Sequence, residues 1–119
     1  MNKSKEQKLY DEKLVLTDDG FNLVFKDGSV RGLLWSDVDR INVFKEDLIT
    51  TDLICMEFLS DRLGHSFDIN EEVDGFWDVA NEVARRFPKA VSRRDWEVEV
   101  KRQPFARSPI NVYDAAKTS

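Results

Sequence analysis

The stretch that most constrains the fold is His65–Pro88, where a short strand pattern runs into a strongly amphipathic helix pattern. Apolar residues recur there at spacings of three and four, which places them on one face of an α-helix. They are Val73, Phe76, Trp77, Ala80, Val83, Ala84 and Phe87. Asn70 is a favourable N-cap residue, and Pro88 ends the pattern. The sequence therefore predicts one long helix over about residues 71–87.

Short apolar runs before this helix predict antiparallel strands. The runs are Lys13–Thr17, Phe21–Lys26, Val30–Trp35, Arg40–Lys45, Asp52–Leu59 and His65–Ile69. Asp19-Gly20 and Asp27-Gly28 separate the first three runs, and glycine readily adopts the positive φ that tight hairpin turns need. The first three runs should therefore form a meander. In the run Asp52–Leu59, the apolar residues at 54, 56 and 58 should face the core, with 53 and 55 making the other face partly apolar.

Two further strands are expected after Pro88. Trp96, Val98 and Val100 alternate with charged residues, which is the period of a half-exposed strand. Ile110–Tyr113 should add a short edge strand. The expected fold class is α+β: an antiparallel β-meander or roll of about six to seven strands, packed by one long amphipathic helix.

The chain of 119 residues has the size of one domain. We expect a polar lead-in over residues 1–9, a single domain over 10–113 and a disordered tail over 114–119. The polar start lacks the apolar core of a signal peptide, and no later stretch has the length of a membrane span. These features predict a cytoplasmic protein.

The spacing of apolar residues along the chain resembles that of the pleckstrin-homology-like (PH-like) β-roll of small bacterial proteins. The resemblance runs through Gly20-Phe21, Trp35-Ser36-Asp37-Val38, Asp52–Phe58, Glu72–Phe76, Phe87-Pro88, Trp96, Val100, Pro104-Phe105 and Tyr113. It implies a recognition scaffold without catalysis. In the pleckstrin-homology fold the helix closes the chain, whereas here strand-like residues follow it.

Charge is distributed unevenly along a chain whose net charge is −5. From Lys45 to Glu82 there are eleven acids and two bases, and from Val83 to Ser119 there are nine bases and four acids. Nucleic acid is disfavoured as a partner, because binding it requires a concentrated basic surface. The acidic segment instead favours a basic protein partner, since charged patches steer association.

Residues for catalysis are scarce. His65 is the only histidine, no Gly-x-Ser-x-Gly motif is present, and the glycine spacing fits no phosphate-binding loop. Cys55, the only cysteine, lies in an apolar run, where a thiol is usually buried and unreactive. We therefore expect no enzymatic activity and no catalytic residue.

A calcium-loop pattern starts at Asp68 but is incomplete. Acidic and amide residues alternate from Asp68 to Asp74, yet Val73 stands where the loop needs glycine and Val79 where it needs a bidentate glutamate. The sequence predicts neither a metal nor a cofactor.

The leading functional hypothesis is a non-catalytic binding module, such as an immunity-type or adaptor protein, that binds a protein partner through an acidic surface. The candidate partner-binding residues are Asp68, Glu71, Glu72, Asp74, Asp78 and Trp77, and the wider surface adds Asp47, Asp52 and Asp61.

Two alternatives stay open. A lipid- or membrane-surface module would use the bases Arg85, Arg86, Lys89, Arg93 and Arg94, although the acidic field makes a membrane partner the weaker hypothesis. A structural homodimer would self-associate through a strand edge or the aromatic helix face.

Overall fold

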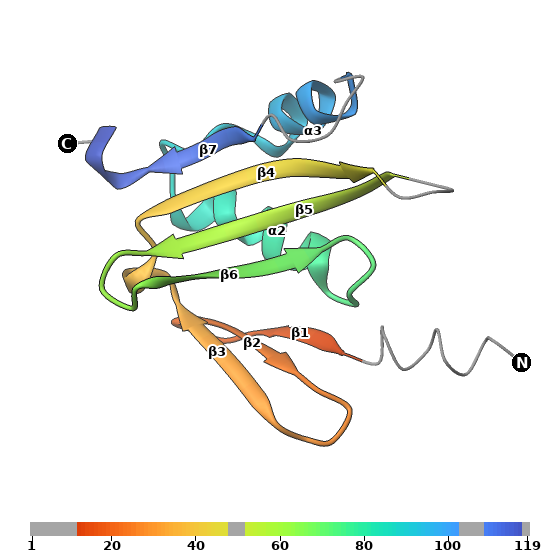
Figure 1. Ribbon diagram of the computed structural model, residues 1–119. Helices are drawn as coiled ribbons and strands as arrows, with labels where there is room; N and C mark the ends of the chain where they lie inside the picture. Colours follow the sequence, from red (N-terminus) through yellow and green to blue (C-terminus); the bar gives the residue numbers. More distant parts are fainter. Residues whose placement is uncertain (1–11, 48–51, 103–108, 118–119) are drawn as a thin grey trace, which may run out of the picture.

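The structure is a computed structural model that describes residues 12–47, 52–102 and 109–117. Within these residues, seven strands form two antiparallel sheets, and two short α-helices pack behind the larger sheet (Figure 1). The α+β class and the antiparallel strands are thereby confirmed. The polar lead-in expected over 1–9 lies outside the described residues.

The smaller sheet, called sheet A, is the expected meander. Its strands follow in the order β1 (Lys13–Leu16), β2 (Gly20–Val24) and β3 (Val30–Leu34). The turn between β2 and β3 contains Gly28 at φ 90°, a conformation that side chains with a Cβ atom rarely adopt. A 3-10 turn, η1 (Trp35–Asp37), then leads the chain out of sheet A.

The larger sheet, called sheet B, has the strand order β6-β5-β4-β7. Its strands are β4 (Arg40–Asp47), β5 (Asp52–Ser60), β6 (His65–Asn70) and β7 (Ile110–Asp114). β7 pairs with β4, with a register shift between Ile41 and Asn42. The tail differs from expectation, because Asp114 ends β7 and Ala115–Lys117 form a further 3-10 turn, η2.

The single long helix expected over 71–87 is wrong. Helix α2 spans Phe76–Arg86 only, because residues 71–75 form turns. The Asn70 side chain accepts a hydrogen bond from the Glu72 N–H at 2.9 Å and so stabilises a turn instead of capping the helix. Gly75, at φ 90°, is the residue from which α2 starts.

The strand expected over Trp96–Val100 is also wrong, since helix α3 spans Arg93–Arg102. Trp96 and Val100 are buried on one helix face, whereas Val98 is 60% exposed. Trp96 and Val100 are four residues apart and so fit a period of two as well as one face of a helix, and alternation alone misled the prediction. Ion pairs at helical spacing, from Glu97 to Arg93 and to Lys101, support the helical form.

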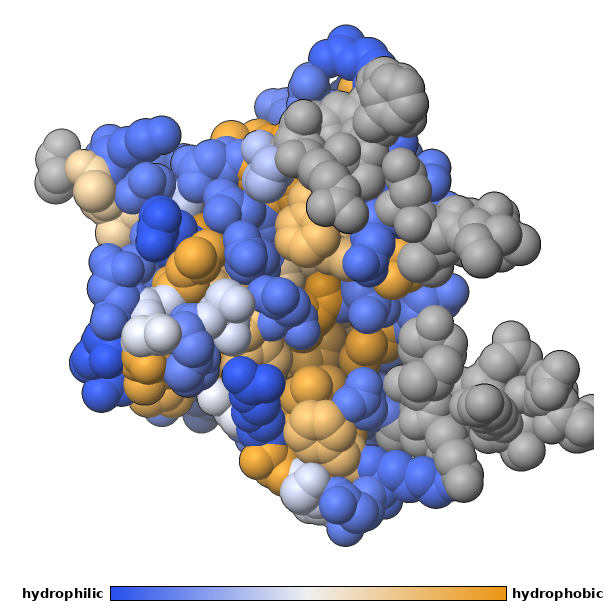
Figure 2. All heavy atoms as spheres, viewed as in Figure 1, coloured by the Kyte–Doolittle hydropathy of each residue, from blue (hydrophilic) through white to orange (hydrophobic). Residues whose placement is uncertain are grey.

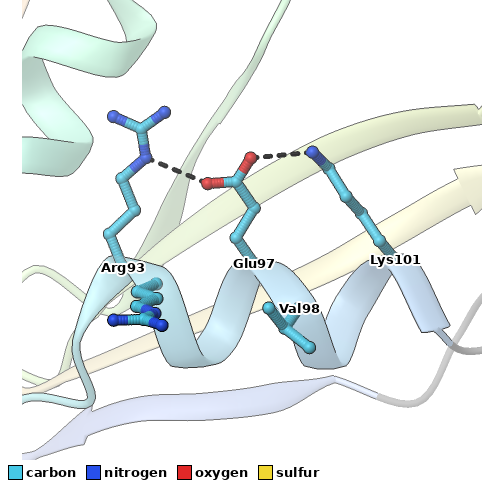
Figure 3. Close-up of a pocket in the computed structure, with 5 residues that line it drawn as sticks. Arg93, Glu97, Val98 and Lys101 are labelled. Atoms are coloured by element: carbon cyan, nitrogen blue, oxygen red, sulfur yellow. Dashed lines mark hydrogen bonds and ion pairs between the residues drawn. The ribbon is translucent and has the colours of Figure 1, made fainter.

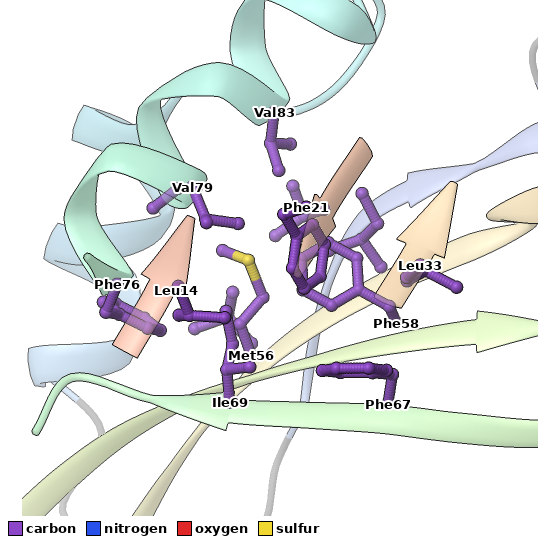
Figure 4. Packing of buried hydrophobic residues seen from close by; sticks show 14 of the residues in the cluster. Leu14, Phe21, Leu33, Met56, Phe58, Phe67, Ile69, Phe76, Val79 and Val83 are labelled. Carbon is purple, nitrogen blue, oxygen red and sulfur yellow. The ribbon is translucent and has the colours of Figure 1, made fainter. Parts of the chain in front are cut away.

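The core lies between the inner face of sheet A, one face of sheet B and helix α2 (Figure 4). Phe21 of β2 joins the two sheets, because its ring centroid lies 5.1 Å from that of Phe58 and 5.3 Å from that of Phe67. From sheet B, Ile54, Met56 and Phe58 point into this core, as expected. Helix α2 contributes buried residues Phe76, Val79, Ala80 and Val83.

Candidate functional site

The face of sheet B that points away from α2 is the most charged sheet surface of the described chain. We call it the open face; Figure 1 and Figure 2 view the molecule from this side. Figure 2 shows hydrophilic side chains around smaller apolar areas. Because strand residues alternate between faces, this face carries the residues that alternate with the core positions, and two of them, Leu53 and Cys55, are themselves buried. They include Arg40, Asn42, Phe44 and Glu46 of β4, Leu53, Cys55, Glu57 and Leu59 of β5, and Ser66, Asp68 and Asn70 of β6.

A row of polar residues crosses all four strands of sheet B on the open face. Asn111, Asn42, Glu57 and Asp68 lie directly opposite one another in the register of β7, β4, β5 and β6. Asn111 Nδ2 donates to Asn42 Oδ1 at 3.1 Å, and Asn42 Nδ2 donates to Glu57 Oε1 at 3.2 Å. The row thus joins two amides to two carboxylates. We call it the polar row.

Asp68 and Glu57 form a like-charge pair at the end of the polar row. Burial raises the pKa of Asp68 above its ordinary value of 3.8, and the negative charge of Glu57 raises this pKa further. A hydrogen bond from Ser66 and the charge of Arg31 act in the opposite direction and do not cancel the effect. Like charges directly opposite one another destabilise a sheet, so this pair has a cost for folding.

Three acids, Glu46 and Asp68 of the open face and Glu71 beside it, act on Cys55. Burial raises the pKa of the Cys55 thiol to about 12, with further contributions from Glu46, Asp68 and Glu71. The Cys55 sulfur lies 4.0 Å from Glu46 Oε1 and 3.8 Å from the Leu53 carbonyl oxygen. The thiol is therefore protonated at neutral pH and takes the place of a small apolar residue among carboxylates.

Beside the open face, the turns before α2 enclose a shallow hollow of about 410 Å³, which we call the acidic hollow. It is lined by Glu71, Glu72, Val73, Asp74, Gly75, Phe76, Trp77 and Asp78. Glu71 connects the hollow to sheet B, because its Oε2 accepts a hydrogen bond from the Ile54 N–H at 3.0 Å. The side chains of Glu72, Asp74 and Asp78 are exposed.

Trp77 is half-buried and already packed. Its ring stacks on Trp96 with centroids 6.2 Å apart, and the guanidinium carbon of Arg93 lies 4.1 Å from the ring centroid. Arg93 also donates to Asn81 Oδ1 at 2.8 Å. Trp77 therefore joins α2 to α3, and it lines the acidic hollow from that position.

The basic residues of α3 are largely neutralised by α3 itself. A second hollow, of about 350 Å³, is lined by Arg93, Arg94, Glu97, Val98 and Lys101 (Figure 3). Glu97 accepts hydrogen bonds from Arg93 at 3.1 Å and from Lys101 at 2.8 Å, and both interactions lower the pKa of Glu97. Such a paired surface attracts anionic lipid weakly.

At the end of α2, the other bases also have partners. Arg85 and Arg86 both pair with Glu82, and Arg86 also donates to the Asp18 carbonyl oxygen at 2.6 Å. A hollow of about 280 Å³ lies beside Phe87 and Tyr113, whose ring centroids are 4.4 Å apart. It is small, and its two rings pack against each other.

His65 is exposed at the start of β6, and its Nδ1 lies 3.3 Å from the Ser66 carbonyl oxygen. It lines a hollow of about 420 Å³ whose neighbouring serines have structural roles: Ser60 Oγ accepts from the Leu63 N–H at 3.1 Å, and Ser66 bonds to Asp68. Across residues 12–47, 52–102 and 109–117, no group of three or more His, Cys, Asp or Glu residues is arranged to hold a metal ion. In the same part of the chain, neither helix has the length and apolarity to span a bilayer.

The structure divides the predicted site residues into two neighbouring groups. Asp68 lies on the open face, whereas Glu72, Asp74, Asp78 and Trp77 line the acidic hollow, with Glu71 between the groups.

The wider acidic surface contributes less than expected. Asp52 pairs with Lys45 and Asp61 with Arg40, each at 3.7 Å, and the Asp47 side chain lies outside the described part. Sequence reasoning did not single out Glu46 and Glu57. Their alternation with the buried residues of β4 and β5 is the signal that places them on the open face.

Comparison of the chain with protein-family models, curated proteins and solved structures returns no match.

Proposed function

We propose that this protein is a non-catalytic binding module that binds a basic protein segment across the open face of sheet B. The observation that carries the proposal is the Glu57–Asp68 pair, two carboxylates directly opposite each other in the register of β5 and β6; burial raises the pKa of Asp68, and the charge of Glu57 raises it further. Conflicts of this kind, retained at a cost in stability, tend to occur at functional surfaces. A lysine or arginine side chain between the two carboxylates would remove the repulsion.

The surroundings of this pair suit an extended basic segment. The amides of Asn42 and Asn111 continue the polar row and can hydrogen-bond to a peptide. Half-buried Phe44 and Leu59 flank the row and offer apolar contact. The acidic hollow extends the negative surface beyond Glu71, so a long basic segment could reach both regions.

A protein partner is favoured over a lipid or a nucleic acid, because acids of the open face remain uncompensated whereas bases of α3 are paired with an acid. The charge of Arg31 acts on Asp68 but does not offset the effects of burial and of Glu57, whereas Arg93 and Lys101 both pair with Glu97. The scaffold would serve recognition, as the resemblance to PH-like proteins implies, and the cytoplasm remains the compartment we propose.

The test measures binding of a decalysine peptide to the full chain by isothermal titration at low salt. Two double variants remove the same charge from different places: Glu57→Gln with Asp68→Asn on the open face, and Asp95→Asn with Glu99→Gln on α3. We expect the first pair to weaken binding by about tenfold and the second by less than about twofold. A third variant, Glu72→Gln with Asp74→Asn, measures the contribution of the acidic hollow.

Equal losses in the open-face and α3 variants would mean that the peptide responds to net charge alone, and the proposed site would be wrong. Binding that does not weaken as salt increases would also contradict an electrostatic contact. After a positive result, capture of partners from the native cell lysate at low and high salt would identify the natural ligand.

A further inference from the structure

The outer face of sheet A is apolar, although nothing in the described chain packs on it. Directly opposed residues of an antiparallel sheet point to the same side, so the register places Lys13, Val15, Asn22, Val24, Val30, Gly32 and Leu34 together on this face. Val15 is 42% exposed, Val30 56% and Leu34 48%. We call this surface the outer face of sheet A.

This composition is unusual for a sheet with one solvated side. Antiparallel sheets that face water on one side normally alternate apolar and polar residues, and strands that are apolar on both sides are typical of sheets covered on both sides. The inner face already packs on the core through Leu14, Phe21, Leu23 and Leu33. The outer face therefore has the character of a surface that a further layer covers.

We propose that this layer is the outer face of sheet A from a second copy of the chain. Two molecules with a net charge of −5 repel each other when their acidic surfaces meet. The outer face of sheet A carries only one charged residue, Lys13, so two copies can approach there with little repulsion. An apolar sheet face is also self-complementary, as a two-fold symmetric contact requires.

The geometry fits face-to-face packing of two sheets about 10 Å apart. Asn22 and Gly32 lie side by side at the centre, where the Asn22 side chain occupies the space that a Cβ atom on Gly32 would fill. The centre of the face therefore holds an amide and a glycine, with Val15 on β1 and Val30 on β3 at its two sides. The patch is small beside the ~800 Å² per partner of a standard interface, so the dimer is weak and depends on concentration.

Sedimentation velocity of the full chain, from low micromolar to millimolar concentration, tests the proposal. We expect a reversible monomer–dimer equilibrium. Val30→Asp and Val15→Asp should each raise the dissociation constant at least about tenfold, because each introduces a charge into an apolar contact. Val98→Asp on α3, an exposed valine of the same chemistry, should change the constant by less than about twofold.

Comparing a variant on β1 (Val15→Asp) with a variant on β3 (Val30→Asp) distinguishes a dimer formed by stacked sheet faces from one formed by paired strand edges. If the copies instead paired through the edge of β3, Val30→Asp would weaken the dimer and Val15→Asp would not, which would overturn the proposal. A wild-type chain that stays monomeric at millimolar concentration would overturn it too.

Val30→Thr, which keeps the shape and strand preference of valine, should weaken the dimer by a smaller factor, and it covers the case in which an aspartate variant fails to fold. Salt separates this contact from the proposed acidic site. The dimer should persist at high salt, whereas peptide binding on the open face should weaken.

Discussion

The two sheets of this protein use the same inner chemistry and opposite outer chemistry. Sheet A and sheet B both direct alternate apolar residues into one core, where Phe21 of β2 meets Phe58 and Phe67. On its outer side, sheet B has the polar row and the acids around it, whereas sheet A has Val15, Val24, Val30 and Leu34. The shared core explains why the chain folds, and the two proposed contacts rest on the difference between the outer faces.

The difference between the two outer faces also determines which kind of contact each can make. Carboxylates on the open face of sheet B attract a partner of opposite charge and repel a second copy. The neutral outer face of sheet A reverses that preference, because only apolar contact is gained there. In the two proposals together, the protein binds a basic partner on sheet B and self-associates through sheet A, and the two contacts do not compete for one surface.

Phe21→Ala is the strongest challenge to this comparison, since both sheets depend on the same aromatic residue. Phe21 is 1% exposed and lies within 5.4 Å, between ring centroids, of Trp35 as well as of the two sheet B phenylalanines. We expect the free energy of unfolding to fall by about 3–5 kcal/mol. Urea unfolding followed by tryptophan fluorescence measures the loss.

Val98→Ala on the exposed side of α3 is the control and should stay within about 0.5 kcal/mol of the wild type. A loss below about 1 kcal/mol for Phe21→Ala, or two separate unfolding transitions in the wild type, would mean that the sheets do not share one core. The comparison would then concern two independent units.

The strands before α2 were predictable from sequence, since their apolar residues alternate and Asp-Gly pairs mark their turns. The start of α2 and the helical form of α3 were not. Asn70 is a good N-cap by residue type, but its side chain stabilises the turn at Glu72, and α2 begins after Gly75, next to the Asp74 carbonyl that accepts a hydrogen bond from the Leu14 N–H of β1. Such a contact over a long sequence distance leaves no local signal.

For α3, Trp96 and Val100 fit both a strand and a helix, and packing against Trp77 decided the outcome. The candidate site was predictable in part. Asp68 and Glu71 follow from charge counting, but only the register shows that Asp68 faces Glu57. The apolar outer face of sheet A requires the register as well, because each short strand also has core residues of the same type.

Gly75→Ala tests how β1 of sheet A is connected to the acidic hollow before α2. Its effect on the free energy of unfolding should be intermediate among these predictions. Gly75 has φ 90°, and a Cβ atom there would lie 2.4 Å from the Leu14 carbonyl oxygen of β1. Gly28 has the same φ with nothing within 4 Å of its Cβ position, so Gly28→Ala measures the cost of the backbone conformation alone, about 1–2 kcal/mol.

Thermal and urea unfolding should show that Gly75→Ala destabilises the protein by at least about 1 kcal/mol more than Gly28→Ala. Equal losses would indicate that β1 and the start of α2 move apart without cost. In that case the acidic hollow and sheet A would be structurally independent.

Asp68→Asn should change the free energy of unfolding least of these variants, and the sign of the change is the informative result. The pKa of Asp68 is raised in the folded protein, so its stabilising effect is fully present below the unfolded pKa, near 3.8, and is lost as the pH rises through the folded pKa. At neutral pH the charged Asp68 therefore opposes folding. Replacing it should stabilise the protein by at most about 0.5 kcal/mol, because Asp68 is only partly buried and solvent screens its charge.

Urea unfolding at pH 7 and at pH 3 measures this gain, which should be present at pH 7 and absent at the lower pH, where wild-type Asp68 is protonated. Asp95→Asn is the control of opposite sign, since Asp95 lies in the first turn of α3 and stabilises the helix dipole. If Glu57 is the cause, Asp68→Asn should stabilise a Glu57→Gln background less than the wild type. A full gain in that background would assign the raised pKa to burial alone, and the open face would lose the charge conflict on which its proposed binding role depends.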